Sequence, residues 1–514
     1  MTAHQPLLIQ AGKLRLPNLR RVARDSAAIA IDEGDLSRVD LCRAFLDKVI
    51  AEKRTIYGVN TGFGKLATTS IVPGELATLQ RNLIMSHCTG TGPELGSGPV
   101  RLALAMKANA LARGHSGVRR LIVTILCDLL RYDIRPCVPA KGSVGASGDL
   151  TPLAHLVSPL IGMGEAVHEG RRLAGGDALA IAGHAPVELA PKEGLALING
   201  TQISTAMALD ALFAAENAFA AALVAGAMSL EAAFGSAVPF DARIHDLRGH
   251  LGQMDVAAAF RALFEGSAIM AAHGSRHRVQ DPYSMRCQPQ VLGACLDTMR
   301  FAARTLEIEA NAVSDNPIVF AEDGDVLSGG NFHAEPVAIA ADLLAIALAE
   351  VGALAERRIA FLVDSSLSGL PPFLVEGSGL NSGLMVAQIT AAALASENKT
   401  LAHPASVDNI PTAANQEDHV SMAAFAARRL AEIADNVTAI LAIEMIAAAQ
   451  GLDFRRPLTS SPVLESALAL VREQVEHIDR DRPLAGDIAL MKGAIVAGTF
   501  RRFVPGALLE PQGP

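Results

Sequence analysis

The chain has 514 residues, half of them hydrophobic and only 4% aromatic, with 44 basic and 53 acidic side chains. Alanine and leucine dominate the apolar residues, which favours helices over strands. The net charge of −9 offers no basic surface for nucleic acid, and charges interrupt the apolar runs, so we expect neither a membrane span nor a secretory signal.

Cysteine and histidine usage gives no sign of a disulfide framework or a metal centre. The six cysteines contain no C-x-x-C pair, so we expect a reducing, cytoplasmic environment. His273 and His277 are four residues apart, but Gly274 and Ser275 between them favour a loop over the helix that a zinc site of this spacing requires. We therefore expect no bound metal.

The first 195 residues combine short helical patterns with turn-rich, glycine-containing stretches. These stretches cover residues 57–64, 88–99 and 139–152. We expect residues 1–195 to form a smaller, mixed N-terminal region that carries functional loops.

Residues 196–514 change to long, alanine-rich helical patterns, from which we predict a mainly α fold with a central bundle. Nearly continuous helices are predicted over 203–234, 336–363 and 419–450. Helices that are apolar almost all round must be buried, so we expect the bundle to extend into a symmetric oligomer. A short hairpin is predicted over 318–328, with its turn at Asp323-Gly324.

The run GSVGASGDL contains Ala146-Ser147-Gly148, a tripeptide that can become an electrophile. Attack of the Gly148 nitrogen on the Ala146 carbonyl closes a five-membered ring, and loss of the Ser147 hydroxyl leaves an exocyclic methylidene. Gly148 has no Cβ, so its nitrogen can approach closely. On the residues alone, a turn or an anion-binding loop remains an alternative, although the lysine of a P-loop is missing.

Two tyrosines and an arginine stand in turn-rich contexts. Tyr57 opens YGVNTGFG, whose glycines permit either a mobile lid or a tight loop anchored by the tyrosine. Tyr283 lies in QDPYSMRCQPQ, where two prolines argue against a regular helix. In the same segment, Arg286 is either a clamp for a carboxylate or a partner in a surface ion pair.

Four more positions carry weaker signals. His87 ends a helical stretch, where an imidazole interacts favourably with the terminal carbonyls. Glu417 is expected in the first turn of the 419–450 helix, where the helix dipole favours an acid. Asn199 and Phe332 are uninformative on their own.

Taken together, nine segments resemble the aromatic amino acid lyase family, and most closely its branch that acts on histidine. They occur in the family's order and are YGVNTGFG, LQRNLIMSH, KGSVGASGDLTPLAH, KEGLALINGTQ, VQDPYSMRCQPQ, IEANAVSDNP, SGGNFHAEPVA, LPPFLVE and ANQEDHVSM. The resemblance implies that Ala146-Ser147-Gly148 becomes 4-methylideneimidazole-5-one (MIO) without outside help, and that neither metal nor nucleotide is needed.

The resemblance also implies roles for the individual residues. Tyr57, Tyr283 and Glu417 would act in catalysis with the triplet, and either Tyr57 or Glu417 would remove the β-proton; we favour Tyr57. The remaining positions would bind substrate: His87, Asn199, Arg286 and Phe332.

The implied reaction is the non-oxidative deamination of L-histidine to trans-urocanate and ammonia, in a cytoplasmic homotetramer with shared active sites. Relatives that act on tyrosine or phenylalanine carry His-Leu or Phe-Leu where this chain has Ser86-His87, and glutamine in place of Glu417. Cys88-Thr89 and the stretch after residue 480 depart from the family pattern. The alternatives are a phenylalanine or tyrosine lyase or aminomutase, and a catalytically dead helical scaffold.

Overall fold

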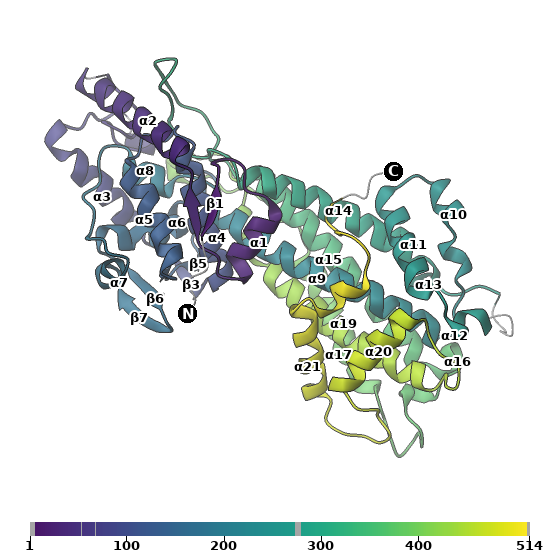
Figure 1. Cartoon of the computed structure of the whole chain (residues 1–514). Coiled ribbons are helices and arrows are strands. Elements are labelled where there is room, and N and C mark those ends of the chain that lie inside the picture. Colours follow the sequence, from purple (N-terminus) through teal and green to yellow (C-terminus); the bar gives the residue numbers. More distant parts are fainter. Residues whose placement is uncertain (1–5, 53, 67, 273–278, 511–514) are drawn as a thin grey trace. The chain divides into compact units, whose positions relative to one another are not determined.

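The computed structural model describes residues 6–510 except 53, 67 and 273–278, and most of these residues are helical (Figure 1). The expected mainly α fold is confirmed. His273 and His277 lie outside the described residues. The chain forms two compact units, each built from three separate stretches of sequence. The first comprises Met1–Asp210, Ala303–Asp342 and Pro404–Arg429, and the second comprises Ala211–Ala302, Leu343–His403 and Leu430–Pro514.

The first unit combines short helices with small sheets and holds most of the predicted site residues. Its helices are α1 (Leu16–Arg24), α2 (Glu33–Ala51), α3 (Leu76–His87), α4 (Ser97–Ala112), α5 (Arg120–Arg131), α6 (Leu150–Val157), α7 (Gly175–Ile181), α8 (Glu193–Ile198) and α18 (Ala423–Arg428). Its 3-10 turns include η1 (Gly64–Leu66) and η7 (Ala413–Asn415). Its strands are β1 (Leu7–Ile9), β2 (Ile29–Ile31), β3 (Thr91–Glu94), β4 (Arg135–Pro136), β5 (Pro139–Lys141), β6 (Glu165–His168), β7 (Arg171–Ala174), β8 (Ile318–Phe320) and β9 (Asp325–Leu327).

The strands pair locally and form no large sheet among the described residues. β1 and β2 are parallel, whereas β3–β5, β4–β6–β7 and β8–β9 are antiparallel. The predicted hairpin is confirmed as β8–β9, with Ile318 opposite Leu327. Gly324 in its turn has φ +76°, a conformation that glycine adopts without strain.

Long helices form the core of the second unit. Three of them meet at Glu444 of α19 (Leu430–Asp453), whose side chain is fully buried. Arg358 of α15 donates to Glu444 from Nη2 to Oε2 at 2.8 Å, and Ser229 of α9 donates to Oε1 at 2.8 Å. The helices with residues in this unit are α9 (Gln202–Ala232), α10 (Ala242–Asp246), α11 (Leu251–Phe264), α12 (Ala268–Ala271), α13 (Tyr283–Arg286), α14 (Gln288–Glu309), α15 (Glu335–Val363), α16 (Ser365–Ser368), α17 (Met385–Leu401), α19 (Leu430–Asp453), α20 (Pro462–Gln474) and α21 (Ala485–Val496).

Two of the three predicted long helices are confirmed, as α9 and α15. The third prediction, 419–450, is partly wrong, because the helix begins only at Ala423 and is interrupted at Arg429. Met422 has a left-handed backbone (φ +56°), and its N–H donates to the Val144 carbonyl at 2.8 Å. Glu417 therefore precedes the helix, and its expected place in a first turn is wrong.

The proline-containing segment around Tyr283 is helical, contrary to the expectation. Pro282 is the N-cap of α13, and Pro289 is the second residue of α14. A proline is tolerated at both places because the first N–H groups of a helix have no partner within it. One helical turn thus carries Tyr283 and Arg286.

Two helices, α9 and α15, are long and apolar enough to cross a membrane by length and composition alone. In the structure, 89% of the most apolar window of α9 and 67% of that of α15 are buried. Buried core helices pass the same test, so this finding is weak evidence for a membrane span.

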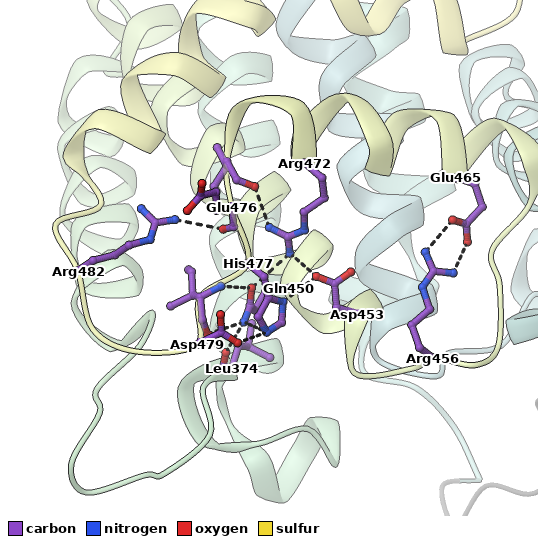
Figure 2. Close-up of polar contacts among 12 residues, drawn as sticks. Leu374, Gln450, Asp453, Arg456, Glu465, Arg472, Glu476, His477, Asp479 and Arg482 are labelled. Atoms are coloured by element: carbon purple, nitrogen blue, oxygen red, sulfur yellow. Dashed lines mark hydrogen bonds and ion pairs between the residues drawn. The ribbon is translucent and has the colours of Figure 1, made fainter.

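Polar contacts secure the C-terminal segment to α19 in the second unit (Figure 2). Asp453 accepts from Arg472 of α20 at 2.7 Å and from His477 Nδ1 at 2.8 Å. The Gln450 amide donates to the carbonyl of Ile478 and accepts from its N–H, at 3.0 and 3.1 Å. These contacts satisfy buried polar groups at the end of the long helix.

Candidate active site

The triplet lies in the loop between β5 and α6, where the backbone admits only glycine at position 148. Gly148 has φ +73°, and a Cβ there would lie 2.2 Å from the Gly200 carbonyl oxygen. That same carbonyl accepts from the Asp149 N–H at 2.7 Å. The loop is thus clamped directly after the triplet, and the neighbouring Gly200 backbone leaves no room for a Cβ at position 148.

The hydroxyl and the carbonyl of Ser147 have partners from distant segments. Its hydroxyl donates to Glu417 Oε1 at 2.6 Å, and its carbonyl accepts from Asn199 Nδ2 at 2.8 Å. Thr412 Oγ1 donates to the other Glu417 oxygen at 2.6 Å, and the backbones of Thr412 and Glu417 form a short bridge. The side chain of Glu417 is therefore oriented toward the hydroxyl that cyclisation would remove.

The rest of the loop is held by the polar side chains of the half-buried Ser143 and of the buried Asp149 and Ser421. Ser143 Oγ donates to Asp149 Oδ1 at 3.1 Å and accepts from the Gly145 N–H at 3.1 Å. Burial raises the pKa of Asp149, and the N–H and hydroxyl of Ser204 oppose this rise by donating to its carboxylate. The Gly145 carbonyl accepts from Ser421 Oγ at 3.0 Å.

Tyr57 anchors the glycine-rich loop that it opens. Its Oη accepts from the Gly64 N–H at 3.0 Å, and its ring packs edge-on against Phe63. The buried Gln80 ties this loop to α8, because its amide donates to the Gly58 carbonyl and accepts from the Leu195 N–H. The turn η1, which ends this loop, contacts η7, which immediately precedes the segment with Glu417.

His87 ends α3, as predicted, and is half-buried. Its Nδ1 lies 2.7 Å from the Leu83 carbonyl. A carbonyl only accepts, so Nδ1 carries a hydrogen, and in the neutral ring Nε2 is left as an acceptor. The turn after His87 is held by His155, whose Nε2 accepts from the Gly90 N–H at 3.0 Å.

Phe332 is half-buried in the loop before α15, and that loop is tied to the triplet loop. The Ala334 N–H donates to the Gly145 carbonyl at 3.2 Å. The neighbouring His333 donates from Nε2 to the His419 carbonyl at 3.2 Å. Phe332 thus lies on a segment connected both to the triplet loop and to the Glu417 segment.

Tyr283 and Arg286 belong to the second unit. The Arg286 guanidinium lies over the Tyr283 ring, 4.8 Å from its centroid. Arg286 Nε is buried and has no hydrogen-bond partner in the described part of the chain. Such an unsatisfied donor fits an arginine that receives a ligand carboxylate.

The structure thus brings Glu417 and Asn199 into direct contact with Ser147. The segment of Phe332 is connected to the triplet loop, and the segment of Tyr57 contacts the turn that precedes Glu417. Three residues of the site were not predicted from the sequence: Thr412, Ser143 and Gln80. Their positions within quoted or neighbouring motifs were the only available signal.

The residues around Gly148 fit formation of MIO, because the backbone excludes a Cβ and the Ser147 carbonyl and hydroxyl are both hydrogen-bonded. Within the described ranges, no group of three or more histidine, cysteine or acidic side chains could hold a metal.

The chain is similar to known proteins over nearly its whole length. The model of the aromatic amino acid lyase family matches residues 14–473, and the chain belongs to this family. It is 56% identical to the histidine ammonia-lyase of Vibrio cholerae over 507 residues, which cover 98% of this chain and 99% of that protein.

Two solved structures share the fold. The histidine ammonia-lyase of Trypanosoma cruzi is 39% identical with a TM-score of 0.89, and the match covers 99% of this chain and 98% of that one. The tyrosine aminomutase of Streptomyces globisporus is 36% identical with a TM-score of 0.92, over 97% and 98% of the two chains. Because a histidine ammonia-lyase and a tyrosine aminomutase share this fold, the fold alone does not identify the substrate, which must be argued from the site.

Proposed function

We propose that this chain is an enzyme that converts L-histidine to trans-urocanate and ammonia without oxidation, the first step of histidine degradation. The observation that carries the proposal is the pair of contacts at Ser147, with Glu417 on its hydroxyl and Asn199 on its carbonyl. The 56% identity to a histidine ammonia-lyase over nearly the whole chain supports the same reaction.

Asn199 and Gly200 would hold MIO made from Ala146-Ser147-Gly148, through the contacts described above. When present, MIO supplies an electrophile for the amino group of the substrate and so makes ammonia easier to release.

Recognition of the imidazole falls to Glu417 and His87. Loss of the Ser147 hydroxyl would remove the donor at Glu417 Oε1, which would free that oxygen for an imidazole N–H, while Thr412 keeps the carboxylate oriented. His87 presents Nε2 because Nδ1 is bound to the Leu83 carbonyl. A phenyl ring would leave both polar groups without a partner, which disfavours phenylalanine.

The remaining residues bind the substrate and move its proton. Arg286 has an unsatisfied buried Nε for the carboxylate. Tyr283 packs against that guanidinium, and Phe332 walls the site. We assign the removal of the substrate's β-proton to Tyr57. Its phenolic oxygen accepts a hydrogen bond from the Gly64 N–H. Glu417 is the alternative base.

An assay of the purified protein with L-histidine, L-tyrosine and L-phenylalanine tests the reaction directly. We expect urocanate and ammonia from histidine and no comparable product from the other two. Turnover of tyrosine or phenylalanine alone would favour the other branch of the family. A protein with its full unmodified mass and no product would be a dead scaffold.

Replacing Glu417 by glutamine tests its role in recognition. The change removes a charge-assisted hydrogen bond worth about 1.5–3 kcal/mol, so kcat/KM for histidine should fall about tenfold or more. Intact mass of the variant shows whether dehydration of the triplet is preserved. Asp418→Asn removes an exposed neighbouring charge and should leave kcat/KM unchanged. Wild-type kcat/KM in Glu417→Gln would contradict the assignment.

We further propose a cytoplasmic homotetramer whose active sites combine residues of several subunits. All six cysteines are free, and apolar side chains such as Val386 and Ile389 of α17 are more than half exposed, which is typical of an interface. The molar mass from light scattering should be that of a tetramer. An active monomer would contradict the proposed assembly. Refolding Tyr57→Phe and Arg286→Ala chains together should restore activity if sites are shared, and complete failure to complement would argue against sharing.

A further inference from the structure

Lys107 of α4 is almost completely buried, at 1% exposure. Its amino group donates to the carbonyl oxygen of Asn199 at 2.8 Å and to that of Ala196 at 3.2 Å. These carbonyls lie at the C-terminal end of α8, so the amino group caps this helix. Burial lowers the pKa of Lys107 to about 7, an effect that Asp315 opposes. The group has hydrogens to donate whether it is charged or neutral.

The two residues that follow α8 form hydrogen bonds with the triplet and with the residue after it. Asn199 Nδ2 donates to the Ser147 carbonyl at 2.8 Å. The Gly200 carbonyl accepts from the Asp149 N–H at 2.7 Å, and the Gly200 backbone lies directly against Gly148. A shift of residues 199–200 would therefore move both the carbonyl of Ser147 and the nitrogen that must attack.

We propose that Lys107 is a positioning residue for cyclisation of the triplet, acting through Asn199 and Gly200. Cyclisation forms the bond between the Gly148 nitrogen and the Ala146 carbonyl carbon. The Ala146 oxygen leaves as water with the amide hydrogens of Ser147 and Gly148. A second water carries away the Ser147 hydroxyl and α-hydrogen, so no oxidant or other reactant is needed. This role rests on the proposed function, since it concerns formation of the same electrophile.

The chain offers a matched control in the same helix. Arg101 of α4 is also 1% exposed and also donates to backbone carbonyls, those of Val22 and Ala27 at 3.1 and 2.9 Å. Arg101 also donates to Asp133 Oδ1 at 2.6 Å, and none of these hydrogen-bond partners belongs to residues 199–200. Arg101→Met and Lys107→Met each remove a buried basic side chain from α4, but only the second removes the hydrogen bonds to the segment that holds the triplet.

The experiment follows the intact mass of the full chain with time after synthesis, together with its thermal unfolding. Lys107→Met should fold but lose its two waters about tenfold or more slowly than the wild type, because small displacements of reacting atoms slow such reactions strongly. Arg101→Met should lower the unfolding temperature and yet dehydrate at the wild-type rate. Lys107→Gln, which is polar but shorter, provides the same measurement if the methionine variant does not fold.

The outcomes separate this inference from the function on which it rests. A wild-type chain that retains its full mass would overturn the proposed function. A dehydrated wild type with an equally fast Lys107→Met variant would overturn the role of Lys107 alone. If neither Lys107 variant folds while Arg101→Met does, Lys107 is a stability residue, and the positioning role is likewise overturned.

Discussion

Ser147→Ala should abolish the electrophile and reduce turnover of histidine by orders of magnitude. Alanine has no hydroxyl that can leave, so the methylidene cannot form, whereas the Asn199 contact to the backbone carbonyl is preserved. Glu417 Oε1 would lose its serine donor. The measurements are intact mass and the rate of urocanate formation. The wild type should be lighter than its sequence mass by two waters.

Ser143→Ala is the matched control for this prediction. Ser143 lies in the same loop and hydrogen-bonds to Gly145, Asp149 and the Gly148 carbonyl, but none of its own atoms is lost in cyclisation. Its alanine variant should still lose two waters, even if the loop is less well held. An unshifted wild-type mass, or wild-type activity in Ser147→Ala, would disprove the electrophile.

Tyr57→Phe should lower kcat by a factor on the order of 10²–10⁴, the usual contribution of a general base, with the mass signature of the triplet intact. The phenyl ring keeps its edge-on packing with Phe63, and only the oxygen that accepts from the Gly64 N–H is lost. A mere anchor of the loop would instead change KM and stability. Steady-state kinetics and thermal unfolding distinguish the two roles.

Tyr132→Phe is the corresponding control, because Tyr132 is 41% exposed at the C-cap of α5. Its kinetics should equal those of the wild type. Exchange of the substrate β-proton provides a second measurement. If Tyr57→Phe retains its kcat while Glu417→Gln abolishes this exchange, the base is Glu417, and Tyr57 serves to hold the loop.

Several residues of the site could be selected from the sequence, but their contacts could not. Ser147 and Glu417 are 270 residues apart, and Ser147 and Asn199 are 52 apart. Resemblance to a family identified these positions, whereas periodicity carries no information about which loops meet. The same holds for Lys107, because a lysine on an apolar helix predicts no role in the sequence. Its role can be inferred only from the backbone carbonyls to which it donates.

Local pattern by itself determined the mainly α fold, the helices α9 and α15 and the hairpin β8–β9, since an apolar helix or a glycine turn depends on neighbouring residues. Only the tertiary structure decided that the third long helix starts at Ala423, because Met422 gives its N–H to Val144 in the triplet loop. It likewise placed Glu417 before that helix and against Ser147. These features depend on hydrogen bonds between segments far apart in the chain, and such bonds override local preference wherever a buried polar group must find a partner.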